Sequence, residues 1–148
     1  MSSSPLTVVA ASLADQIAAQ LAGLNSSYGE LQVEPRRIFN PTPPAIDIYP
    51  ADAVAQEQAG FGFANRDAFL AVRARVAMAD EDAGQDLLLE LADVGSTSIM
   101  AAIAADQSLG GTVDAVAVES QSGFRVYEDV PGSGAYLGCE WTLRVVRS

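Results

Sequence analysis

The chain has 148 residues with 19 acids and 8 bases, all of them arginine, so its formal net charge is −11. This length corresponds to one domain, and a hydrophobic content of 49% is typical of a protein that folds around a single core. The acidic excess excludes a broad basic surface that grips nucleic acid. The absence of histidine excludes Ser-His-Asp and Cys-His catalysis and every histidine-ligated metal.

The first predicted element is a helix over Leu6–Leu24. Large apolar residues recur there at three- and four-residue steps and form one stripe lined with alanine. This stripe favours a helix that packs on the core, and a helix that binds a partner is the alternative. Leu31–Phe39 is then expected to hold an edge strand broken by Pro35, and Ala45–Tyr49 a short strand.

Residues Ala51 to Arg66 are predicted to form a long loop, a feature that is often functional in a small domain. Its two phenylalanines, Phe61 and Phe63, either pack on the core or contact another subunit.

The clearest strand pattern covers Arg66–Ala79, where apolar residues alternate with Arg73 and Arg75. This period of two predicts a strand whose arginines lie on its wetter face. The favoured interpretation is that they pair with acids of the same or a neighbouring subunit. Phosphate binding is the alternative, both here and at Arg36–Arg37.

The remaining chain alternates between helix and strand. Helices are predicted over Asp82–Val94 and Thr97–Asp106, because the apolar period changes to that of a helix. Strands are predicted over Val113–Ser120, Phe124–Glu128 and Tyr136–Arg147, joined by short loops into an antiparallel meander. This order predicts a single α+β domain over residues 1–148, with a mostly antiparallel sheet and about three helices packed on one face.

The single cysteine, Cys139, allows neither an internal disulfide nor a multi-cysteine metal site. It alternates in phase with Trp141 and Leu143, which predicts a small core residue rather than a nucleophile. Trp141 is itself expected to be buried. No run of roughly 18 strongly apolar residues occurs, which predicts no membrane-spanning helix and no membrane partner. Met1–Pro5 lacks the positive charge of a signal peptide.

Three segments resemble metal-binding or anion-binding sites only superficially. Asp82, Asp86 and Glu90 share one helical face but do not converge on a cation. Gly132–Gly138 has the wrong glycine spacing for a phosphate loop and leads into a strand. Gly95–Ser98 could bind an anion, but Ser96 or Thr97 is better explained as a helix cap. The sequence therefore predicts no catalytic, cofactor-binding or metal-binding residue, and the chain is not expected to be an enzyme.

Five segments carry a likeness to a known family: Ile46–Pro50, Gln85–Leu89, Gly95–Ile99, Ala105–Val113 and Tyr136–Leu143. The order of these segments resembles that of the tail terminator proteins (minor tail or tail-completion proteins) of long-tailed bacteriophages, in the version found in phages of actinobacterial hosts. The similarity covers about Ala45 to Val146. Its most specific part is the segment Asp-x-x-Leu-Gly-Gly, residues Asp106 to Gly111, which is followed by the closing strands.

The resemblance implies a structural virion protein that forms a homo-hexameric ring on the last ring of the tail tube. Such a ring stops tube polymerisation, presents the surface that joins the head, and passes DNA through its lumen without sequence-specific binding. The implied partners are further copies of the chain, the tail tube protein and a head-tail connector or neck protein. The implied location is the head-proximal end of the virion tail, after assembly in the host cytoplasm. No catalytic residue and no cofactor is implied.

Two other functions stay open on the sequence. One is a head-side adaptor or stopper of the head-tail connector, and the other is a small-ligand-binding or enzyme-subunit α+β domain. In a ring, arginines of one copy would face acids near the start of the second helix of its neighbour. The residues expected at this subunit or partner interface are Arg73, Arg75, Phe61, Phe63, Asp80 and Asp82.

Overall fold

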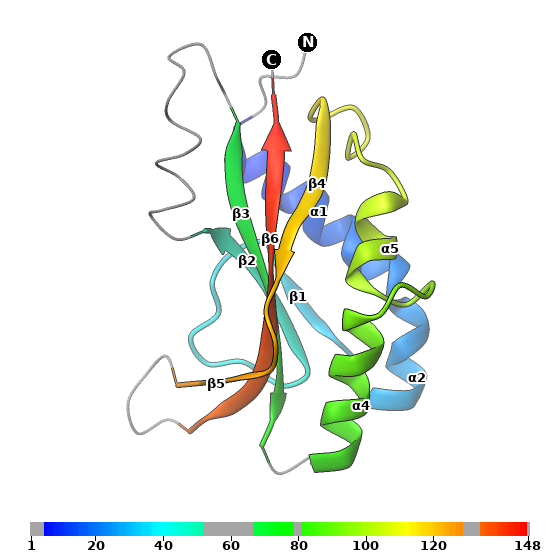
Figure 1. The fold of residues 1–148 in the computed structure, drawn as a ribbon, viewed down its shortest axis with the longest axis vertical. Helices are drawn as coiled ribbons and strands as arrows, with labels where there is room; N and C mark the ends of the chain where they lie inside the picture. The colour runs from blue at the N-terminus through cyan, green and yellow to red at the C-terminus, as the bar shows by residue number, and fades with distance from the viewer. Residues whose placement is uncertain (1–4, 52–66, 79–80, 129–133, 148) are drawn as a thin grey trace.

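The computed structural model describes residues 5–51, 67–78, 81–128 and 134–147 (Figure 1). Within these ranges, helices α1 (Leu6–Gln20), α4 (Glu81–Ala92) and α5 (Ile99–Ala104) lie on one side of a six-stranded sheet. A 3₁₀ turn (Ala22–Leu24) and the short helix α2 (Asn25–Tyr28) continue α1. The predicted α+β class is confirmed.

The sheet is antiparallel except at one edge. β1 runs parallel to β2 at that edge, and all the other strand pairs are antiparallel. The edge position of β1 agrees with the prediction from Pro35. Across the sheet the order is β1 (Gln32–Glu34), β2 (Ala45–Pro50), β3 (Ala68–Ala77), β6 (Tyr136–Val146) and β4 (Ala115–Gln121), and β5 (Arg125–Tyr127) also pairs with β6.

The predicted meander of the last three strands is wrong. β4 and β5 both pair with β6, β4 with its C-terminal half and β5 with its N-terminal half. Between them the amide of Ser122 donates to the Glu140 carbonyl at 2.8 Å, and the Ser122 hydroxyl accepts from the Glu140 amide at 2.9 Å. These bonds keep the chain beside β6 where the sequence predicted a reversing turn at residues 121–123.

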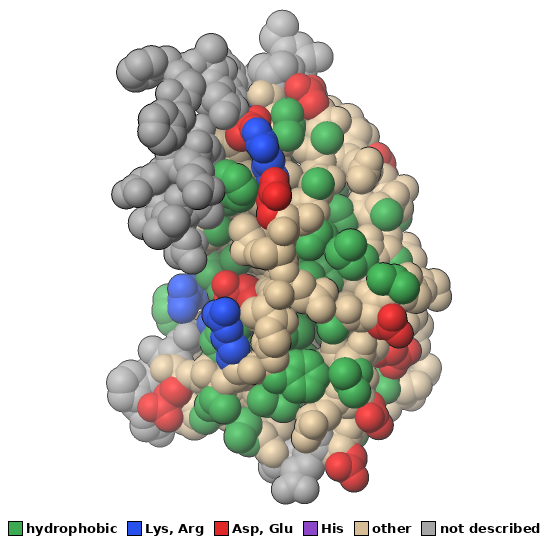
Figure 2. All heavy atoms as spheres, viewed as in Figure 1, with side chains coloured by type: hydrophobic (Ala, Val, Ile, Leu, Met, Phe, Trp, Pro, Cys, Tyr) green, Lys and Arg blue, Asp and Glu red, His purple; other side chains and the backbone are tan. Residues whose placement is uncertain are grey.

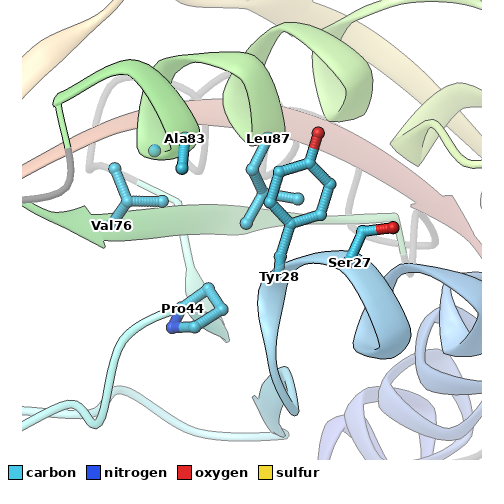
Figure 3. A pocket seen from close by; sticks show the side chains of 7 residues that line it. Ser27, Tyr28, Pro44, Val76, Ala83 and Leu87 are labelled. Atoms are coloured by element: carbon cyan, nitrogen blue, oxygen red, sulfur yellow. The ribbon is translucent and has the colours of Figure 1, made fainter.

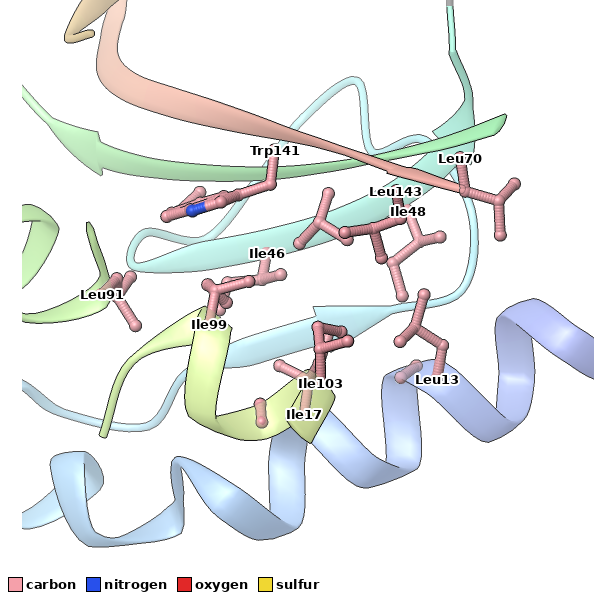
Figure 4. Close-up of a cluster of buried hydrophobic side chains, with 14 of the residues drawn as sticks. Leu13, Ile17, Ile46, Ile48, Leu70, Leu91, Ile99, Ile103, Trp141 and Leu143 are labelled. Carbon is pink, nitrogen blue, oxygen red and sulfur yellow. The ribbon is translucent and has the colours of Figure 1, made fainter. Parts of the chain in front are cut away.

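The core lies between the helices and one face of the sheet (Figure 4). The register places Leu70 opposite Leu143 and Val72 opposite Trp141 on this face. Trp141 is fully buried, as predicted, and its Nε1 donates to Gln121 Oε1 at 2.7 Å. The side chains that meet these strands in Figure 4 come from α1 (Leu13, Ile17), β2 (Ile46, Ile48), α4 (Leu91) and α5 (Ile99, Ile103).

The first helical run packs as a core helix. Val9, Leu13, Ile17 and Leu21 are fully buried and belong to the hydrophobic core, which is the packing that the apolar stripe predicted. By length and composition alone, the helical run Leu6–Tyr28 is long and apolar enough to span a membrane, since it has 23 residues and a mean hydropathy of 1.3. The sequence pattern predicted no such helix. A helix that buries one face in a protein core meets the same criterion.

Charge is unevenly divided between the helices and the strands. Helices α1 and α4 contain acids (Asp15, Glu81, Asp82, Asp86 and Glu90) and no base, and α5 has no charged residue. The described arginines lie in strands or next to them (Arg36, Arg37, Arg73, Arg75, Arg125, Arg144 and Arg147). In Figure 2 the visible arginines gather over the strands, and acidic side chains run down the edge formed by the helices.

Candidate functional site

The sheet face turned away from the helices carries a cluster of buried charges. The antiparallel register of β2 and β3 sets Asp47 opposite Arg73. Arg73 Nε donates to Asp47 Oδ1 at 3.1 Å, and its Nη2 donates to Oδ2 at 2.6 Å. Arg75 Nη2 donates to the same Oδ2 at 3.2 Å. One carboxylate therefore holds two guanidinium groups.

This cluster corrects the sequence interpretation of β3. Arg73 and Arg75 were expected on a wetter face, but they are 0% and 1% exposed. Their shared partner is Asp47 of the same chain, whose carboxylate pairs with both guanidinium groups and offsets part of the cost of burying them. Side chains buried to this extent have almost no accessible surface in this conformation, and their expected contact with a neighbouring subunit stays a prediction.

A second carboxylate, Glu140, completes the cluster. Tyr49 donates its hydroxyl to Glu140 Oε1 at 2.8 Å, and the Tyr127 hydroxyl lies 3.4 Å from the same oxygen. The Arg73 guanidinium lies 5.1 Å and 5.2 Å from the centroids of these two rings. Burial raises the pKa of Tyr127 to about 12, and burial with the Glu140 hydrogen bond raises the pKa of Tyr49. Both phenols therefore stay protonated at neutral pH.

The cluster fixes the segment that follows β1. The Ile38 carbonyl accepts from Arg75 Nη2 at 2.6 Å, and the Ile38 amide donates to Asp47 Oδ2 at 3.0 Å. The neighbouring Phe39 is 55% exposed, and the Arg37 guanidinium lies 5.9 Å from its ring centroid. The buried ions thus hold an aromatic ring and an arginine at the surface.

Gly138 is required where β5 covers β6. A Cβ atom at this position would collide with the Ala74 carbonyl oxygen and would lie 3.0 Å from Tyr127 Cε2. The glycine of the Tyr136–Leu143 segment therefore makes room for the ring that covers Arg73.

The structure describes only one of the other predicted interface residues. Phe61, Phe63 and Asp80 lie outside the described residues, and Asp82 is exposed on α4. Asp47 was not predicted from the sequence. Its position between two isoleucines was the available signal, since a carboxylate in an apolar strand is buried only with a cationic partner.

Three acids of α4, Asp82, Asp86 and Glu90, have different surroundings. Asp82 and Asp86 are exposed, whereas Glu90 accepts from the Tyr28 hydroxyl at 3.0 Å and the Thr97 hydroxyl at 3.1 Å. Among the residues that the structure describes, no three metal-ligating side chains group together.

The Gly95–Ser98 segment ends in a helix cap. Ser98 Oγ accepts from the Ala101 amide at 3.0 Å, so the cap of α5 is Ser98 and not Ser96 or Thr97.

The Asp-x-x-Leu-Gly-Gly segment forms the turn from α5 toward β4. Asp106 Oδ1 accepts from the Ser108 amide at 3.0 Å, and its Oδ2 accepts from the Gly110 amide at 2.9 Å. Leu109, Gly110 and Gly111 have φ angles of 51°, 71° and 88°. Two glycines suit this left-handed run because they lack a Cβ atom. The most specific part of the resemblance is therefore a structural turn.

Asp106→Ala should lower the melting temperature at neutral pH, and the difference should shrink as the pH falls below 3.8. Hydrogen bonds from Ser108 and Gly110 hold the pKa of Asp106 below its ordinary value of 3.8. A carboxyl group whose pKa is lower in the folded state than in the unfolded state stabilises the fold at pH values above its unfolded pKa. This stabilisation is lost as the pH falls through the folded-state pKa. Thermal melts of both proteins across this range provide the measurement. A difference that does not change with pH would contradict the prediction.

Cys139 has the core position that its alternation predicted. It is fully buried, and burial, with a further contribution from Glu140, raises the pKa of its thiol to about 12. We expect a thiol reagent at pH 8 to label Cys139 only after the protein is denatured, because reaction requires an accessible thiolate. Mass spectrometry of native and denatured samples measures this. Prompt labelling of the folded protein would contradict the assigned burial.

A pocket of about 200 Å³ lies between α2 and α4 (Figure 3). Ser27, Tyr28 and Pro44 line one side, and Ala83 and Leu87 line the other. Figure 3 shows both hydroxyl groups directed away from the other labelled side chains. The described lining therefore lacks the converging polar groups that orient a small ligand.

Comparisons with protein-family models and with curated proteins find no match to this chain. Its residues, its fold and the sequence resemblance therefore carry the evidence for its function.

Proposed function

We propose that this chain is a tail terminator, a structural virion protein that caps the tail tube of a long-tailed bacteriophage as a ring. The ring stops tube polymerisation and provides the surface that joins the head. The order of sequence motifs and the α+β fold support this function. The observation that carries it is a division of exposed charge, with Arg36 and Arg37 beside β1 and Asp82 and Asp86 on α4.

This division favours a contact between unlike surfaces of two identical copies. A heterologous contact that is repeated with a rotation closes into a ring. Each copy brings a net charge of −11, so assembly has to overcome repulsion. Salt screens such repulsion, and we expect rings to form at high protein concentration and moderate salt. An acidic ring is also suited to a channel that passes DNA without holding it.

The buried cluster supports a structural role. Asp47 and Glu140 balance Arg73 and Arg75, so these four groups leave no net charge on this face. Their hydrogen bonds position backbone and tyrosine rings. A general acid or nucleophile needs instead a group that faces a substrate.

Deletion of the gene in the phage, with complementation from a plasmid, tests the function. We expect tails that are not joined to heads and tubes of uncontrolled length, and the plasmid copy should restore normal particles. Tails of normal length, normally joined in the absence of the protein, would contradict the proposal. Heads that fill with DNA and leak, beside tails of normal length, would favour a head-side adaptor.

A further inference from the structure

The segment Arg36–Phe39, named here the Phe39 loop, has the character of a docking element. Arg36 and Arg37 are exposed, and Phe39 is 55% exposed. The backbone between them is anchored through Ile38 to the buried Asp47 cluster. An aromatic side chain flanked by arginine on a fixed backbone loses little conformational entropy on binding, and both residue types are enriched among residues that dominate interfaces.

A groove at the start of α4 has the complementary chemistry, because apolar side chains and an aspartate line it. Its volume is about 350 Å³, and a cavity of about 150 Å³ is enough to hold benzene, so an aromatic ring fits. Apolar side chains are exposed on the elements around it: Met78 is 48% exposed, Leu89 on α4 is 58% exposed, and Val126, which pairs with Leu137, is 61% exposed. The residues that line this α4 groove are Val76, Ala77, Met78, Asp82, Gln85 and Leu137.

Figure 2 shows hydrophobic side chains gathered over the lower part of the molecule, where β5, the N-terminal half of β6 and α4 lie. Asp82 and Asp86 add two exposed carboxylates on α4, one turn apart, and α4 contains no base. The α4 groove is therefore an apolar depression with an acidic margin.

We propose that the α4 groove of one copy receives the Phe39 loop of a second copy. Phe39 enters the groove, and Arg36 and Arg37 face Asp82 and Asp86 of the neighbour, so two positive charges meet two negative charges. In Figure 1 the loop follows the cyan trace to the left of the sheet, whereas α4 lies at the lower right. The contact is therefore heterologous, and each copy uses both surfaces once.

This inference rests on the proposed ring and names the surfaces that form it. It also assigns a new role to the two arginines of β3. Arg73 and Arg75 were expected to contact the neighbour directly, whereas in this arrangement they and Asp47 hold the loop that makes the contact.

Cysteine cross-linking tests the pairing. In a Cys139→Ala background, Asn40→Cys, which is exposed and keeps Phe39, and Leu89→Cys are made as separate full-length proteins. A short bis-maleimide is added at high protein concentration and moderate salt. We expect cross-linked dimers when the two proteins are mixed and none from either protein alone. A protein with both substitutions should give a ladder of higher species. Val8→Cys, on α1 and 46% exposed, is the matched control and should not cross-link to Asn40→Cys.

Charge reversal supplies the second measurement. Arg36→Glu with Arg37→Glu should reduce the cross-linked fraction by at least about tenfold, because like charges then meet. Asp82→Arg with Asp86→Arg in the Leu89→Cys partner should restore it. Equal cross-linking of the Val8 and Leu89 variants, or no cross-link in the mixture, would overturn the pairing.

Light scattering separates this inference from the ring itself. A hexamer that forms without the cross-link between positions 40 and 89 overturns the named surfaces and leaves the tail terminator proposal in place. Normal tails in the phage deletion would contradict the proposed function. A specific cross-link between the Phe39 loop and the α4 groove would, even then, still support the contact between copies.

Discussion

Asp47→Ala should lower the free energy of unfolding by about 3–5 kcal/mol, as expected when one partner of a buried ion pair is removed. The variant leaves the guanidinium groups of Arg73 and Arg75 buried without their shared carboxylate. It also removes the acceptor of the Ile38 amide. Urea unfolding monitored by circular dichroism measures the loss.

Asp86→Ala is the matched control, because it removes the same side chain from an exposed position on α4. It should change the free energy of unfolding by no more than about 0.5 kcal/mol. If the Asp47 and Asp86 variants lost equal stability, the buried cluster would not have the energetic role described here.

Trp141→Ala should also cost about 3–5 kcal/mol, since it creates a large cavity in the core. Trp141 is fully buried opposite Val72, and its indole N–H donates to Gln121. The variant removes this hydrogen bond together with the packing. Chemical denaturation measures the change, and circular dichroism is needed because Trp141 is the only tryptophan.

Trp141→Phe keeps most of the ring and should lose clearly less stability than Trp141→Ala. In the unsubstituted protein, tryptophan emission should be blue-shifted in the native state and should move to longer wavelength on unfolding. A native spectrum like that of tryptophan in water would contradict the burial of Trp141.

Much of the fold could be predicted from periodicity. The change from period two to period 3.6 after β3 located α4, and the alternation of Cys139, Trp141 and Leu143 identified the core face of β6. These patterns are local, and each follows from one element that buries one face. The predicted loop over residues 51–66 falls almost entirely outside the described ranges.

The errors concern contacts between distant residues. Whether Arg73 is solvent-exposed or buried depends on Asp47, which lies 26 positions earlier in the chain. The two residues meet only because β2 pairs with β3. The meander failed for a related reason. Residues 121–123 have the composition of a turn, but the hydrogen bonds of Ser122 to Glu140 decide the path of the chain. A single sequence gives no register between strands, and the site is built from that register.

The interruption at Ser122 divides β6 into halves that differ in how firmly they are held. β3 pairs with both halves. On the other side of β6, the seven residues of β4 hold one half, whereas three residues of β5 hold the other. Amide hydrogens of the β5 half should therefore exchange with solvent through local opening, and those of the β4 half only when the whole domain unfolds. We therefore expect β5 to open as a separate cooperative unit while the core stays closed.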